Sequence, residues 1–170
     1  MKIIHQKTIQ TPLGDMIACA VDEGICLLEF TDRKNIEKQL KSLSKTLQAD
    51  ITEKDHPHFV QLEEELKEYF DGKRIRFEVP LHTTGTEFQE KVWQLLREIP
   101  MGEIRTYKQQ SEFLGNPKAI RAVGTANGIN KIAILIPCHR VIGSNGELIG
   151  YAGGIWRKQK LLELEKAILF

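Results

Sequence analysis

The spacing of apolar and polar residues in the first half of the chain predicts short strands followed by two helices. Apolar runs at 15–21 and 24–30 are joined by a short polar turn, which is typical of a β-hairpin. Apolar residues then recur at helical spacing over 36–47 and again over 59–69, so each stretch predicts a helix with one buried face. Asp71-Gly72 is expected to end the second helix.

A change in composition near residues 80–85 marks the expected boundary between two domains, 1–80 and 81–170. Beyond this boundary, Thr86 and Gln89 have the spacing of a capping box, in which each residue bonds to the backbone of the other. The apolar face of the helix that they begin continues to Ile99.

Two short helical stretches follow at 106–114 and 116–126, and a final helix is expected over 155–170. Asn116 and Pro117 are the expected N-cap and first residue of the second short helix. The two helices fit a helix-turn-helix, but by pattern alone they fit equally well an αα-hairpin that only packs.

Charge is distributed unevenly, although the whole chain carries only +1. Residues 1–85 carry a net −3 and residues 86–170 a net +4, and the stretch 104–160 holds nine Lys or Arg against two Glu. Such a segment could bind a polyanion, but a solvated basic face without a partner explains the charge equally well. Arg121 is the only charge in its helix after Lys118, which favours minor-groove or backbone binding with one probing arginine.

Composition excludes several classes of protein. With 41% hydrophobic and 28% charged residues the chain is ordinary and globular, and no run of about 18 apolar residues could span a membrane. The first ten residues lack the apolar core of a secretory signal. An odd, sparse set of three cysteines favours a reducing, cytoplasmic setting, with Cys19 and Cys26 as core residues. His56 and His58 are expected in an exposed loop, because no further ligand stands at metal-binding spacing.

The strongest chemical signal is a cysteine between a proline and two basic residues, Pro137-Cys138-His139-Arg140. The apolar run 132–136 predicts a buried strand that would deliver Cys138 at its end. A thiolate needs a base or positive surroundings, and His139 could reach the thiol directly or through one water. Glu165, near the apolar stripe of the last helix, is either a buried partner for His139 or an exposed residue; its spacing leaves both open.

Residues 136–141, Ile-Pro-Cys-His-Arg-Val, closely resemble the active-site signature of the O6-alkylguanine-DNA alkyltransferases, a family of DNA repair proteins. The strong resemblance covers residues 80–166, about half the chain. It implies an α+β chain with a small ribonuclease H-like sheet-plus-helix domain followed by a winged helix-turn-helix domain. Further segments that match the family pattern in order and spacing are 85–89, 92–93, 99–103, 106–107, 121–124, Asn130, 150–154 and 161–165.

The resemblance implies a catalytic role for five residues. Cys138 would accept the alkyl group, and His139, acting through a water, would form with Glu165 the relay that keeps the cysteine a thiolate. Asn130 would tie the cysteine turn to the DNA-binding helix. Tyr107 would stabilise the departing guanine.

The resemblance also assigns residues to DNA and substrate binding. Arg121 would fill the gap left by the flipped nucleotide, with Ala122 and Tyr107 also at the DNA. Val141, Tyr151 and Ala152 would line the pocket for the guanine.

The implied activity is that of a methylated-DNA–protein-cysteine methyltransferase, which transfers the alkyl group to Cys138 in a single turnover after flipping the damaged base. Its expected partner is double-stranded DNA containing O6-alkylguanine, with O4-alkylthymine as a further candidate. The expectation is a cytoplasmic monomer that needs no metal or soluble cofactor and binds no membrane. Two rival interpretations are a lesion-binding module without catalysis and a cysteine hydrolase.

Overall fold

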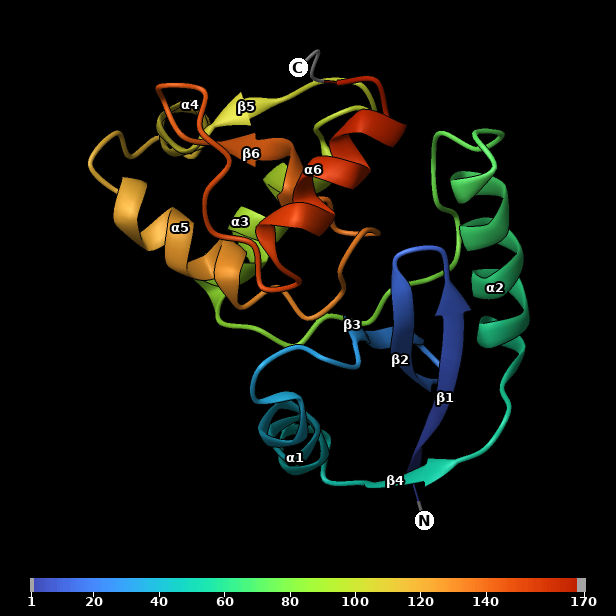
Figure 1. Cartoon of the computed structure of the whole chain (residues 1–170). Coiled ribbons are helices and arrows are strands. Elements are labelled where there is room, and N and C mark those ends of the chain that lie inside the picture. Colours follow the sequence, from blue (N-terminus) through green and yellow to red (C-terminus); the bar gives the residue numbers. More distant parts are fainter. Residues whose placement is uncertain (1, 168–170) are drawn as a thin grey trace. The chain divides into compact units, whose positions relative to one another are not determined.

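The computed structural model describes residues 2–167, and the chain divides into two compact units, Met1–Thr84 and Gly85–Phe170 (Figure 1). Within the described residues, no helix has both the length and the apolar character needed to cross a bilayer. Both strands and helices are present, so the expected α+β class is confirmed. The first unit contains, in order, β1 (Ile3–Thr11), β2 (Gly14–Val21), β3 (Gly24–Phe30), α1 (Ile36–Leu47), β4 (Asp50–Glu53) and α2 (Pro57–Phe70).

The four strands of the first unit form one sheet in the order β3-β2-β1-β4. The predicted hairpin of β2 and β3 is confirmed, whereas the strand patterns of β1 and β4 were not recognised in the sequence. β1 runs antiparallel to β2 and parallel to β4. Gly24, at the start of β3, has a φ of 152°, and a Cβ there would lie 2.6 Å from the Pro80 carbonyl oxygen, so only glycine fits this close approach.

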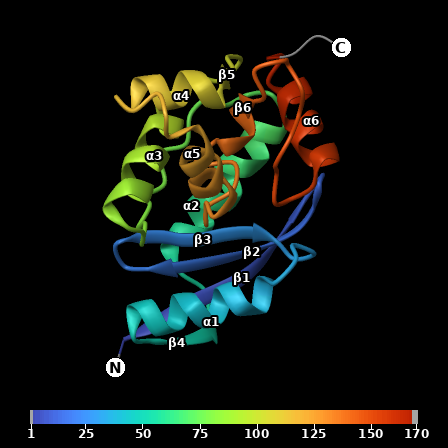
Figure 2. The same ribbon diagram turned by 90° about the vertical axis from the view of Figure 1, so that its left-hand side faces the viewer.

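The two helices of this unit cover opposite faces of the sheet (Figures 1 and 2). Under α1, Leu43 packs with Ile4, Cys19 and Leu27 in a cluster of buried side chains. The other helix, α2, buries the stripe Phe59, Leu62, Leu66 and Tyr69. Both helices therefore form as their apolar spacing predicts, and Cys19 and Cys26 lie in the core as expected.

His56 and His58 do not lie in an exposed loop, so that prediction is wrong: His56 caps α2 and His58 lies in its first turn. His56 is buried, and its Nδ1 accepts a hydrogen bond from the backbone N–H of His58 at 3.1 Å. Its Nε2 lies 3.1 Å from Asp22 Oδ1. A ring nitrogen thus satisfies a backbone donor that the first turn of a helix leaves unpaired.

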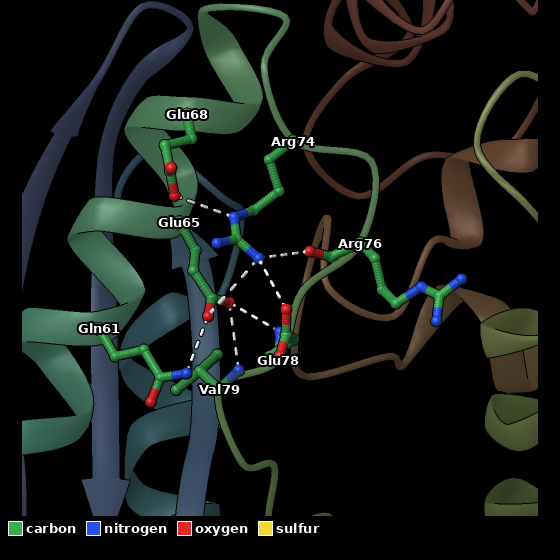
Figure 3. Close-up of polar contacts among 7 residues, drawn as sticks. All are labelled: Gln61, Glu65, Glu68, Arg74, Arg76, Glu78 and Val79. Carbon is green, nitrogen blue, oxygen red and sulfur yellow. Dashed lines mark hydrogen bonds and ion pairs between the residues drawn. The ribbon is translucent and has the colours of Figure 1, made fainter.

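A buried carboxylate fastens the segment that follows α2 onto that helix (Figure 3). Glu65, on α2, accepts hydrogen bonds from the backbone N–H groups of Glu78 at 2.8 Å and Val79 at 3.1 Å. It also accepts from Gln61 at 2.8 Å, and Arg74 lies 3.9 Å away. Because a buried carboxylate is costly without partners, these four groups account for its place there.

The second unit contains α3 (Glu87–Arg97), β5 (Arg105–Thr106), α4 (Tyr107–Phe113), α5 (Ile120–Gly128), a 3-10 turn η1 (Cys138–Arg140), β6 (Val141–Ile142) and α6 (Ile155–Leu164). Two short parallel strands, β5 and β6, accompany the helix pair α4–α5. Trp93 of α3 donates its indole N–H to the Ala126 carbonyl at 3.0 Å, which ties α3 to α5.

Two helices of this unit begin at capping boxes. The capping box of Thr86 and Gln89 forms as predicted, and a second one forms between Thr106 and Gln109 at the start of α4. The start of the next helix was predicted wrongly, because residues 116–119 make a turn in which the Ala119 N–H bonds to the Asn116 carbonyl. α5 then begins at Ile120.

The final helix is shorter than predicted. α6 ends at Leu164, and Lys166 takes a φ of 58° that breaks the helical path. Residues 168–170 of the predicted helix lie outside the described residues.

Candidate active site

Cys138 does not follow a strand, so the prediction of a buried strand at 132–136 is wrong. The segment is buried, but it consists of tight turns, in which the N–H of Ile136 bonds to the carbonyl of Ile132. Ile134 has a φ of 72°, which a β-branched residue rarely adopts. Apolar composition indicated burial correctly, but it could not distinguish a buried strand from buried turns.

Asn130 holds these turns in place and also contacts the sulfur. Its Oδ1 accepts from the Ile132 N–H at 3.0 Å, and its Nδ2 donates to the Ile136 carbonyl at 2.8 Å. The same Nδ2 donates to Cys138 Sγ at 3.3 Å. Because a hydrogen-bond donor stabilises negative charge on sulfur, Asn130 both shapes the cysteine turn and favours a thiolate.

His139, Arg140 and Glu165 form a buried charged cluster beside this cysteine. Glu165 Oε2 accepts from His139 Nε2 at 2.7 Å and from Arg140 Nη2 at 3.1 Å, while Oε1 accepts from Arg140 Nε at 2.9 Å. Arg140 also donates to the Ile99 carbonyl at 2.6 Å. Of the two positions left open for Glu165, the structure has the buried one, in contact with His139.

The electrostatics of this cluster favour an ionised carboxylate. Burial alone would raise the pKa of Glu165, but the charge and hydrogen bonds of His139 and Arg140 lower it to about 2. The carboxylate therefore stays charged at neutral pH and fixes the N–H of His139 on Nε2. His139 Nδ1 is buried and has no hydrogen-bond partner among residues 2–167, so in the neutral form of the ring it is available as an acceptor.

Lys158 is a further charged group of the site, and no sequence motif indicated it. Its side chain is fully buried, and its Nζ donates to the Ile149 carbonyl at 2.7 Å. Burial lowers the pKa of Lys158 to about 8, although the nearby Cys138 acts in the opposite direction. A signal was available in the sequence, because Lys158 stands three residues before Leu161 and seven before Glu165, on the buried stripe of α6.

Tyr107 shares its hydrogen-bond acceptor with this lysine. Its hydroxyl donates to the Ile149 carbonyl at 3.2 Å, and the ammonium of Lys158 lies 5.8 Å from the centre of its ring. Burial, and then the charge of Cys138, raise the pKa of Tyr107 to about 12. The phenol therefore remains protonated at neutral pH and can act as a hydrogen-bond donor.

Of the three residues assigned to DNA binding, Arg121 and Ala122 lie on α5, whereas Tyr107 is the first residue of α4. Arg121 and Ala122 are exposed and line a groove of about 560 Å³ between α5 and the start of α3. Lys118 and Phe88 line the same groove. A groove with two basic side chains, next to small residues, permits close approach of a polyanion.

The predicted pocket residues differ in exposure. Val141 is completely buried and directly follows the cysteine turn, whereas Tyr151 is half-buried and Ala152 is exposed. The loop that carries the last two is fastened by Arg157, which donates to the Gly153 carbonyl at 3.0 Å. Within residues 2–167 no three His, Cys, Asp or Glu side chains are grouped so that they could hold a metal ion.

Comparison with protein families assigns both units. The family model for the DNA-binding domain of 6-O-methylguanine DNA methyltransferase matches residues 87–167. The model for the ribonuclease-like domain of the same family matches residues 4–83. The two matches together cover most of the chain.

Individual relatives agree with these matches over nearly the whole length. The methylated-DNA–protein-cysteine methyltransferase of Methanosarcina acetivorans is 42% identical over 95% of this chain and 98% of its own. The constitutive enzyme of that name from Bacillus subtilis is 41% identical, covering 95% of each chain.

Solved structures confirm the fold. The crystal structure of the O6-methylguanine methyltransferase of Mycobacterium tuberculosis matches with a TM-score of 0.83 at 38% identity, covering 97% of this chain and 94% of that one. The Mycobacterium tuberculosis protein in complex with DNA matches with a TM-score of 0.82 at 39% identity, covering 96% and 93%. The chain therefore belongs to the 6-O-methylguanine DNA methyltransferase family.

Proposed function

We propose that this protein repairs O6-alkylguanine in DNA by transferring the alkyl group to Cys138, once per molecule. Two hydrogen bonds carry the proposal. Asn130 Nδ2 donates to Cys138 Sγ, and His139, the next residue, donates from Nε2 to Glu165. This arrangement supplies a nucleophile, a base and a group that orients the base, which is the pattern of an activated cysteine. The names of the Methanosarcina and Bacillus relatives describe the same activity.

The first step is formation of the thiolate. His139 Nδ1, linked to Cys138 through one water, accepts the thiol proton, and Glu165 stabilises the imidazolium through Nε2. The Nδ2 of Asn130 and the positive charge of Lys158 then stabilise the anion on sulfur.

The second step is a displacement at the alkyl carbon. The Cys138 thiolate forms the new S–C bond while the bond from carbon to guanine O6 breaks, and the electron pair stays on the guanine. Tyr107 releases the Ile149 carbonyl and donates its hydroxyl to the leaving base, which reduces the charge in the transition state. The product is a thioether, which water does not hydrolyse, so the protein is consumed.

Access to the lesion requires that the damaged nucleotide leave the duplex. Extrusion costs a few kcal/mol, and Arg121 on α5 offsets part of this cost by occupying the vacated space. Ala122 lets the helix approach the DNA closely. Val141, Tyr151 and Ala152 then line the pocket for the flipped guanine.

The proposed partner is double-stranded DNA that contains O6-alkylguanine, because a relative with 39% identity has been crystallised with DNA. We further propose that the protein works as a monomer in the cytoplasm. All the proposed catalytic groups come from one chain, and none of Cys19, Cys26 and Cys138 forms a disulfide, which suits a reducing compartment.

The decisive experiment incubates the protein with a duplex that carries one O6-methylguanine and then measures intact-protein mass. We expect a gain of one methylene on the peptide that contains Cys138 and none in Cys138→Ala. Binding without a mass gain would identify a lesion-binding module. Turnover of an ester or peptide without lasting label would identify a hydrolase.

A further inference from the structure

In the part of the chain that the structure describes, no strand lies beside the second half of β1 on the side that faces away from β2. β2 pairs with β1 from His5 to Thr11, but on the other side β4 pairs only with Ile3 to Gln6 (Figure 1). The Lys54 N–H bonds to the Gln6 carbonyl at 3.2 Å, just past the end of β4. Residues 7–11 of β1 therefore form a sheet edge that nothing in residues 2–167 pairs with as a strand.

The peptide groups that face this edge belong to Thr8 and Gln10. In a strand, alternate residues direct both backbone groups to the same side, so Thr8 and Gln10 face the side that Gln6 faces. The opposite strand supports this geometry, because the carbonyl of Asp15, the partner of Gln10, bonds away from β1 to Thr31 N–H at 2.9 Å. Two N–H donors and two carbonyl acceptors thus point outward, and each of these residues is exposed.

A groove of about 860 Å³ lies between this edge and α2. Residues 7–11 line one side, and Val60, Glu63, Glu64 and Lys67 of α2 line the other. Val60 is 69% exposed and gives the α2 side of the groove an apolar surface. Five residues of strand span about 17 Å, so the edge is long enough to bind a short extended segment.

The ionisable groups around the groove are mostly acidic. Asp15, Glu63, Glu64 and Asp71 line it, against Lys7 and Lys67. Lys7 is paired with Glu63 at 2.8 Å and Asp55 at 3.3 Å, so Lys7 and Glu63 compensate each other, and Asp15, Glu64 and Asp71 remain against Lys67. The groove therefore favours a cationic occupant over an anionic one.

We propose that this groove binds an extended, lysine- or arginine-containing segment of another protein, which adds as a strand to β1 at Thr8 and Gln10. Backbone hydrogen bonds supply the affinity, and alternate basic side chains meet Glu64 and its acidic neighbours. The site lies wholly in the first unit and shares no residue with the alkyl-transfer site.

The test uses a fluorescein-labelled peptide of about seven residues in which lysine and valine alternate, titrated with the full-length protein by fluorescence polarisation. Two control peptides are a glutamate–valine version and a version with alternate backbone nitrogens methylated, which cannot pair along a strand. We expect binding of the first peptide below about 1 mM and at least tenfold weaker binding of both controls.

Matched protein variants locate the site. Glu64→Lys reverses a charge in the groove and should weaken binding at least fivefold, whereas Glu37→Lys makes the same change on exposed α1 and should leave it unchanged. Addition of the peptide should also slow amide hydrogen exchange at Thr8 and Gln10. No binding, equal binding of the methylated peptide, or equal loss in both variants would overturn the proposal.

Discussion

Replacement of Glu165 by glutamine tests the energetic role assigned to the buried carboxylate. The folded protein lowers the pKa of this group from 4.5 to about 2. At about 1.4 kcal/mol per pKa unit, the ionised form contributes about 3 kcal/mol to the free energy of unfolding at neutral pH. The side chain is 0% exposed, so solvent does not screen this contribution appreciably.

The pH dependence follows from the direction of the shift. Because the folded pKa lies below the unfolded value, the stabilisation is complete above about pH 5 and is lost as the pH falls toward 2. We expect Glu165→Gln to lower the free energy of unfolding by about 3 kcal/mol at pH 7 but by only about 1 kcal/mol at pH 3. The variant should also transfer alkyl groups much more slowly, because His139 loses the carboxylate that stabilises its charge.

Urea unfolding, monitored by circular dichroism at several pH values, measures the free energy of unfolding of the wild type and of the variant. In the difference between the two, the contributions of the other carboxyl groups largely cancel. Glu163→Gln is a matched control, because Glu163 lies two residues earlier, is exposed on α6, and has a side chain that contacts Lys160 and Gln159 there. The control should change stability by less than about 0.5 kcal/mol. A difference for Glu165→Gln that stays constant from pH 7 to pH 3 would refute the reasoning.

Three further predictions concern transfer and DNA binding. Cys138→Ala should abolish labelling from alkylated DNA while duplex affinity stays within about twofold, since phosphate contacts dominate binding. Cys19→Ala should destabilise the protein but retain labelling, and loss of labelling in this variant would contradict the assignment of Cys138 as the acceptor. Arg121→Ala should slow single-turnover repair of a duplex lesion but not transfer from free O6-benzylguanine, and equal slowing on both would exclude a role in base extrusion. Since burial lowers the pKa of Lys158 to about 8, the wild-type transfer rate should fall as the pH rises through that value. If the pH–rate profile of Lys158→Met keeps the same fall, another group is responsible for it.

Local chemistry explains which parts of the fold were predictable. The capping box of Thr86 and the apolar stripes of α1 and α2 depend on residues a few positions apart, so they could be recognised in the sequence. The turns at 132–136 could not, because they depend on the side chain of Asn130 and on an unusual φ at Ile134. β4 was missed because it is only four residues long and pairs with a strand far away in the sequence.

The site shows the same division. The position of Cys138 was evident from its neighbours, but spacing left the partner of Glu165 open, and only the folded chain brings it to 2.7 Å from His139. The bidentate contact from Arg140 joins residues 25 positions apart, which no local pattern reveals. Lys158 was counted only as part of a basic segment, although its place on an apolar stripe was visible.

The position of Asn130 couples the chemical state of Cys138 to the stability of the turns before it. The same amide nitrogen donates to the Ile136 carbonyl, which is part of the turns, and to the sulfur of Cys138, which is the proposed nucleophile. A thioether accepts hydrogen bonds weakly and carries an extra carbon, so after transfer the hydrogen bond from Asn130 Nδ2 to the sulfur is weakened. Asn130 is bonded at both ends of these turns, to the Ile132 N–H and to the Ile136 carbonyl, so their geometry depends on its side chain. We therefore expect the alkylated protein to unfold at a lower urea concentration than the unreacted protein.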